Sequence, residues 1–297
     1  MKPLHAGFAA ALVVCLNTTP SAATAQELAP ASPRVDAIDL HIACMALIPL
    51  RSLPAPLLRA MAGDGDAFPR VQEGVNGLRR TLPKPQPGAD EAAPKASSAK
   101  AAGIFDPMQP AVERLERNAS ALVARQTTVV QARRALQAVS RQSVELLDAV
   151  QRLLTEQTVA RARPYDVVVT SQLAMLSQRI GKSASEFLTD DGLNPDAVFL
   201  IGKDVQVFQA LASAALNGDA SLGLRPPRSR ATRERAAQLM QQFELTHKLV
   251  DQVLAGLKDL VAAREAQSQM LADAETLDTA LAALCAGPPS ASAPVHR

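Results

Sequence analysis

The sequence predicts an all-α protein, built as two stacked four-helix bundles that share two long helices. The chain of 297 residues is 47% hydrophobic but only 3% aromatic, and alanine and leucine dominate its apolar residues. This composition suits closely packed helices. Apolar residues also recur at helical spacing over long stretches, and Gly, Pro and Asn separate these stretches.

Residues 1–25 have the features of a secretory signal peptide. A lysine follows the initiator Met, residues 6–16 form a short apolar run, and Ala23-Thr24-Ala25 offers a small-x-small cleavage pattern. The apolar run is too short to span a bilayer, which takes roughly 20 residues. We therefore expect cleavage before Gln26 and export to the periplasm.

A lipoprotein signal that ends at Cys15 is the weaker alternative. A small residue normally precedes a lipid-modified cysteine, and Val14 is not small. No segment after residue 25 suggests a membrane span, so we expect a mature protein without one, in an oxidising compartment. The basic residues are scattered and the formal net charge is +2, which argues against nucleic acid as a partner.

The region before residue 110 is irregular. Residues 26–35 form a leader rich in Pro, Ala and Ser. Residues 36–82 are a degenerate first helical-bundle unit, with a turn at Gly63–Asp66 between two helices. Prolines predict that its first helix is kinked or broken: Pro49, Pro54 and Pro56. Residues 83–109 hold further prolines among Ala, Lys and Ser, which predicts a flexible linker.

From Pro110 the pattern becomes regular and predicts four helices. The first runs to about Arg161, and the others cover about 165–189, 194–217 and 229–284. A seven-residue apolar repeat marks the first of them, with Ser143 as its one gap: Leu115, Leu122, Val129, Leu136 and Val150. Asn194 is the expected cap of the third helix, and Asn217-Gly218 its end.

Helix lengths predict how these elements pack. At 1.5 Å per residue, the two long helices would extend roughly 75 and 80 Å and the two short ones only about 35 Å each. Two short helices can cover one half of the long pair, which makes one four-helix bundle. The helices of 36–82 would then cover the other half and complete a second, stacked bundle.

The segment Met175-Leu176-Ser177-Gln178-Arg179-Ile180-Gly181-Lys182 resembles a stretch of the PilJ-type sensor domain. That domain is the extracytoplasmic N-terminal module of type IV pilus chemoreceptors and is related to the sensor region of nitrate/nitrite histidine kinases. The stretches 199–208 and 216–227 resemble the family's next helix and its exit turn, while residues 62–68 keep only a trace of the other module. The resemblance implies a sensor domain over 110–284.

Two departures from the family pattern limit what the resemblance implies. Ala174 stands where the family has an arginine just before Met175, and in the nitrate sensors an arginine of this stretch holds the anion. The resemblance therefore leaves open whether nitrate or nitrite is sensed here. The chain also has no recognisable cytoplasmic signalling coiled coil. We therefore expect it to act through a membrane partner.

The candidate ligand-binding residues are Arg179, Gln178, Gln172 and Lys182. On a helix, Arg179 borders the apolar face and stacks with Gln172 and Met175, so its guanidinium could bind an anion within the bundle. The alternative is an arginine that pairs with a neighbouring Asp or Glu.

Catalysis and metal binding find little support. His41, His247 and His296 lie far apart, without the spacing of a metal site, and there is no phosphate-binding glycine loop or nucleophile elbow. We expect no enzyme activity, cofactor or metal.

Two cysteines remain after cleavage, Cys44 and Cys285. In the predicted threading the first helix starts, and the last helix ends, at the same end of the stack. A disulfide between them is therefore the candidate bond, and two unpaired cysteines are the alternative. Residues 285–297 are expected to be a disordered tail.

The sequence thus favours a periplasmic sensing module related to type IV pilus chemoreceptor sensor domains. Its expected partner is a small ligand or a pilus or chemosensory membrane protein, and a homodimer is a further expectation. The alternative is a structural periplasmic adaptor without a small-molecule ligand. A polar pocket between helices would favour the first function, and a dry leucine core throughout would favour the second.

Overall fold

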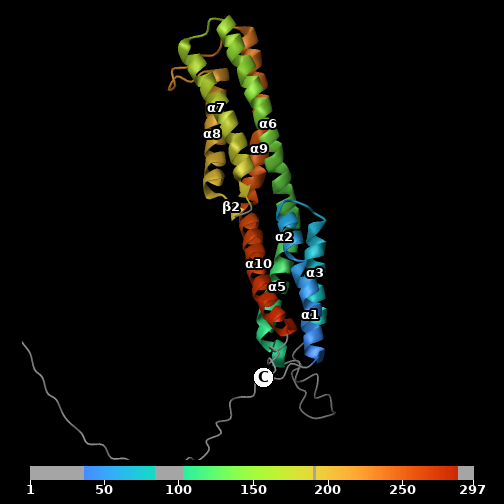
Figure 1. The fold of residues 1–297 in the computed structure, drawn as a ribbon. Helices are drawn as coiled ribbons and strands as arrows, with labels where there is room; N and C mark the ends of the chain where they lie inside the picture. Colours follow the sequence, from blue (N-terminus) through green and yellow to red (C-terminus); the bar gives the residue numbers. More distant parts are fainter. Residues whose placement is uncertain (1–36, 84–102, 190–191, 287–297) are drawn as a thin grey trace, which may run out of the picture. The chain divides into compact units, whose positions relative to one another are not determined.

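A computed structural model describes residues 37–83, 103–189 and 192–286, all within one compact unit, Val35–Arg297. The described chain is mostly helical, which confirms the helical part of the predicted fold class (Figure 1). The signal peptide, the leader, the linker residues 84–102 and the tail beyond residue 286 lie outside the described residues.

The first region contains three helices: α1 (Ala37–Arg51), α2 (Pro54–Met61) and α3 (Ala67–Thr81). The prolines act as predicted, since α1 ends soon after Pro49 and α2 begins at Pro54, where a proline's missing N–H needs no partner. The predicted turn is present, and Gly63 has a φ of +89°.

Residues 103–109, which were expected to belong to the linker, are helical. A 3-10 helix, η1 (Asp106–Met108), leads into α5 (Gln109–Val123). Phe105 is completely buried, and the Gln109 side chain donates a hydrogen bond of 2.9 Å to the Pro83 carbonyl. The buried Phe105 side chain therefore anchors residues 103–109 to the core.

The prediction of two unbroken long helices is wrong at one point in each. The first is divided into α5 and α6 (Gln126–Val159), and the last into α9 (Arg230–Ala255) and α10 (Leu257–Ala286). At the first break the Arg125 N–H bonds the Leu122 carbonyl at 3.0 Å, a tight three-residue turn. The second break lies at Gly256, where an added Cβ would be 2.9 Å from Thr128 Cγ2. The two breaks therefore lie side by side.

The two shorter helices are α7 (Pro164–Glu186) and α8 (Pro195–Asn217). The predicted helix 165–189 is too long, because a small antiparallel hairpin follows α7 instead: β1 (Leu188–Thr189) pairs with β2 (Gly192–Leu193). Asn194 caps α8 as predicted, and its side-chain oxygen accepts from the N–H groups of Asp196 and Ala197.

The helices pack in two sets. In one, α6 contacts α7 and α9, and α8 contacts the same two helices; in the other, α10 contacts α1 and α5, and α3 contacts the same two (Figure 1). One hydrophobic cluster runs through both sets. In the first set Phe208 of α8 stacks on Phe243 of α9, with ring centroids 4.5 Å apart.

Two stretches are long and apolar enough to cross a membrane by length and composition alone, Ala37–Met61 and Pro195–Asn217. The expectation that no segment after residue 25 suggests a span is wrong in this respect. Helix α8 has apolar side chains on its buried face, such as Ile201 and Phe208, and also on its exposed face, namely Phe199 and Val207. The helix is therefore apolar on more than its core face. Both stretches pack against neighbouring helices of the unit.

Candidate functional site

Arg179, the main candidate ligand-binding residue, is paired with an acidic side chain. Its Nη2 atom lies 2.9 Å from Oδ1 of Asp204 on α8. The Asp204 side chain is 2% exposed and that of Arg179 is 41% exposed. Burial raises the pKa of the Asp204 carboxyl, and the charges of Arg179 and Lys203 counteract part of this effect.

The other three candidates, Gln172, Gln178 and Lys182, are exposed on α7. Lys182 Nζ lies 3.8 Å from the Glu186 carboxylate, one turn along the helix. The structure therefore brings Arg179 to Asp204 and does not gather the four candidates into one pocket. None of them lines the cavity described below.

Cys44 of α1 and Cys285 of α10 lie together and form a disulfide, with their Cα atoms 5.2 Å apart. Nearby on the same helices, Arg51 Nε is 2.6 Å from Oδ1 of Asp278. These contacts link the start of the described chain to its end. Of the histidines, His247 stacks beside Phe243 with centroids 5.7 Å apart. Within the described ranges no group of three His, Cys, Asp or Glu side chains is placed to hold a metal ion.

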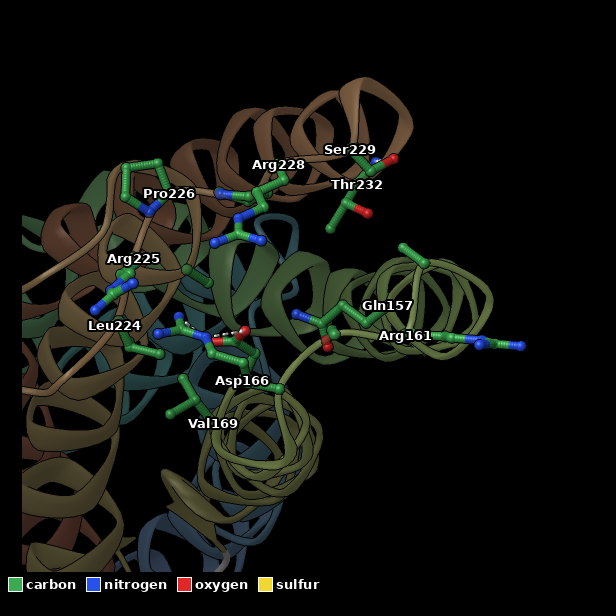
Figure 2. A pocket seen from close by; sticks show the side chains of 15 residues that line it. Gln157, Arg161, Asp166, Val169, Leu224, Arg225, Pro226, Arg228, Ser229 and Thr232 are labelled. Carbon is green, nitrogen blue, oxygen red and sulfur yellow. Dashed lines mark hydrogen bonds and ion pairs between the residues drawn. The ribbon is translucent and has the colours of Figure 1, made fainter.

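A cavity of about 240 Å³ lies where the α6–α7 turn meets the loop between α8 and α9 (Figure 2). Its wall comes from the last turn of α6, the start of α7, the end of α8 and the start of α9. Four arginines and one aspartate line it, together with apolar side chains. Cavities of this kind, which combine an apolar wall with a few polar groups, are typical of small-molecule sites.

The α6–α7 turn is built by two backbone hydrogen bonds. The Ala162 N–H donates to the Gln157 carbonyl at 2.8 Å and the Arg161 N–H to the Thr158 carbonyl at 3.1 Å. Arg161 has a φ of +52°, the left-handed conformation that ends a helix in this motif. Its side chain extends away from the cavity (Figure 2).

The next arginine along the turn is held at the cavity wall by an acidic partner. Arg163 Nε and Nη2 lie 3.0 and 2.8 Å from the two carboxylate oxygens of Asp166. This bidentate pair occupies the guanidinium of Arg163.

The loop between α8 and α9 is held by local contacts. Gly218, with a φ of +80°, lets the chain pass against the Pro226 ring. Hydrogen bonds from Ser221 and Leu222 to the Asp219 carboxylate lower the pKa of Asp219. The Arg233 guanidinium donates to the Pro227 carbonyl at 3.0 Å. These contacts fix the segment that carries Arg228.

Inside the cavity lie two buried polar side chains that lack a hydrogen-bond partner. Gln157 is 4% exposed and Thr232 is 5% exposed, and neither Gln157 Oε1 nor Thr232 Oγ1 has a partner among the described residues. The Arg228 side chain is directed toward the space beside Gln157 (Figure 2). No described acidic side chain pairs with Arg228.

This cavity was not predicted from the sequence, although one polar residue in an apolar repeat pointed to it. Gln157 lies seven residues after Val150, so it continues the apolar repeat of the first long helix with a polar side chain. A polar residue at a core position needs a partner, and none is visible in sequence.

Comparison with known proteins supports the family resemblance. A search of curated proteins found no match. A family model described as "type IV pili methyl-accepting chemotaxis transducer N-term" matches residues 167–269. The match is narrower than the expected range of 110–284 and begins inside α7, covers α8 and α9, and ends within α10. The match to the PilJ family model thus covers somewhat more than a third of the chain.

Proposed function

We propose that the protein is an exported, non-catalytic sensing module that works in the periplasm with a pilus or chemosensory membrane protein. The PilJ match over 167–269 is the observation that carries the proposal. The matched segment also supplies much of the cavity wall, including Leu224, Arg228 and Thr232. A polar pocket between helices favours sensing over a purely structural role.

The architecture we infer is two four-helix bundles that share two interrupted long helices. The two sets of helix contacts support it, because in each set four helices pack in a closed ring. The cavity belongs to one set and the Cys44–Cys285 bond to the other. The α5–α6 and α9–α10 segments connect them.

Signal transfer between the sets would pass through the paired helix breaks. Arg125 at the first break lies 3.4 Å from the Asp259 carboxylate, which follows the second break. A change in the packing of α6 against α9 would alter the bend at both breaks together. The face formed by α1 and α10 would then be presented differently to a membrane partner.

The test is a deletion strain of the source organism, assayed for pilus-dependent surface motility and for the location of the protein. We expect altered motility, which the full-length gene restores. A matched gene that starts at Gln26 lacks the export signal and should fail to restore it. Unchanged motility, or full rescue by the unexported chain, would contradict the proposal.

The alternative function, a structural adaptor, has one specific observation in its favour. On α1 the side chains of Ile38, Met45 and Ile48 are 62%, 46% and 64% exposed. They lie at helical spacing and form an apolar stripe outside the shared core. An adaptor would restore motility in the deletion strain even when the cavity is filled by substitution, whereas a sensor would not.

A further inference from the structure

We propose that the cavity between α6, α7 and the α8–α9 loop binds a free amino acid with a small aliphatic side chain. The proposal deepens the sensing function and rests on it for its physiological meaning. The binding itself can be measured on the purified protein without reference to motility.

The cavity carries a site for a carboxylate. Arg228 points into it, and no described acidic group neutralises its guanidinium (Figure 2). Of the four arginines at the wall, Arg163 already holds Asp166 in a bidentate pair and the Arg161 side chain extends away (Figure 2). Arg225 and Arg228 are then the cations available to a ligand, and Arg228 is the one directed toward Gln157. The N-terminus of the 26-residue helix α9, capped by Ser229, also lies at the wall and favours negative charge.

Two buried side-chain oxygens at the cavity have no hydrogen-bond partner among the described residues. Gln157 Oε1 and the hydroxyl oxygen of Thr232 are shielded from solvent and lack a partner among the described side and main chains. A buried acceptor without a donor costs free energy, which a ligand recovers when it supplies one. An ammonium group can donate to Gln157 Oε1, and the Thr232 hydroxyl, in the first turn of α9, can donate to the ligand's carboxylate. The ligand should therefore combine a carboxylate with an ammonium group, which is the chemistry of an amino acid.

Size and the apolar wall restrict the side chain. The cavity is about 240 Å³, at the small end for ligand sites. Its wall includes the buried Val169, Ala215 and Leu224, which can cover a few methyl groups. Valine is a ligand of the right size, whereas an aromatic side chain would lack room.

The probes are three small molecules that separate these contributions, measured by isothermal titration calorimetry at low ionic strength. L-valine has both charged groups, isovalerate lacks the ammonium group, and isobutylamine lacks the carboxylate. We expect L-valine to bind and each truncated probe to bind about 10- to 100-fold more weakly. Equal binding of isovalerate would overturn the assignment of Gln157 as the acceptor for the ammonium group. No measurable binding of L-valine below about 10 mM would overturn the proposal.

Substitutions at the cavity provide the second test. Arg228→Gln should weaken L-valine binding about 10- to 100-fold. Gln157→Leu should weaken it to a similar extent while leaving the unliganded protein at least as stable, because it removes an unpartnered amide oxygen. The matched control is Arg152→Gln, which removes the same charge from an exposed side chain of α6 that does not line the cavity. Equal effects of Arg228→Gln and Arg152→Gln would show a general charge effect and refute the site.

The amino acid site and the sensing function can be refuted separately. If L-valine binds but the deletion strain has normal motility, the site is retained and the sensing function is wrong. If the deletion strain is defective but neither L-valine nor the variants behave as expected, the amino acid site is wrong and the sensing function is retained.

Discussion

The contact between α6 and α7 can be tested at Gly181, in the segment that carries the family resemblance. A Cβ at this position would overlap Ser143 Oγ and lie 2.8 Å from Ser143 Cβ. Gly181→Ala should gain up to about 1 kcal/mol from helix propensity. Overpacking costs about 1–3 kcal/mol, and the upper end applies because Ser143 Cβ moves only with its backbone. We expect a net loss of about 2 kcal/mol, or roughly 4–8 °C in Tm.

The matched rescue is Ser143→Gly, which removes both atoms that the new methyl would meet. The next neighbour of the added Cβ is the Ser140 carbonyl oxygen at 3.9 Å, an ordinary contact. In a double-mutant cycle by urea unfolding, the two substitutions should therefore couple favourably by about 2 kcal/mol. The close approach of the helices would be refuted by either of two results. One is that Gly181→Ala leaves the free energy of unfolding unchanged, and the other is that the double variant is no more stable than Gly181→Ala alone.

Three further predictions concern stability. Peptide mapping without reductant should recover Cys44 linked to Cys285, and reduction should lower Tm. The disulfide's contribution to the free energy of unfolding has an upper limit of roughly 5 kcal/mol from chain entropy. Free thiols in the folded protein would contradict this prediction. Because the pKa of Asp204 is raised, the native state binds more protons than the unfolded state above about pH 4. The free energy of unfolding should therefore fall as the pH rises through the native pKa. Asp204→Asn should remove this pH dependence in urea titrations from pH 4 to 7. Arg161→Gly should add about 1 kcal/mol in the same assay, because the left-handed conformation costs glycine little; a loss would show that the arginine side chain stabilises the turn.

Sequence patterns predicted those parts of the fold that depend on local chemistry. Pro54 begins a helix, Asn194 caps one, and Gly218 follows the end of another, because each acts through its own backbone conformation. The helical class follows from composition and periodicity for the same reason. These signals need no knowledge of the neighbouring helices.

The helix breaks could not be predicted from periodicity. Leu122 and Val129 keep the seven-residue spacing although the helix is interrupted between them, so the apolar stripe continues across the turn. At Gly256 the cause is the approach of Thr128 from another helix, which is a tertiary contact. The hairpin after α7 was missed because strands of two residues have too few positions to show alternation.

The two polar positions in the apolar repeat of the first long helix have different structural causes. Ser143 is small and polar where α7 approaches through Gly181, and its hydroxyl donates to the Ser140 carbonyl at 2.7 Å, so its hydrogen bond is satisfied within its own helix. Gln157 is larger, and its buried Oε1 atom has no such partner in the described chain. A serine in a stripe can thus be explained by close packing, whereas the unpartnered oxygen of a buried glutamine is what the proposed ligand site rests on. The sequence displays both interruptions in the same way, and only the geometry around each one separates the packing contact from the proposed site.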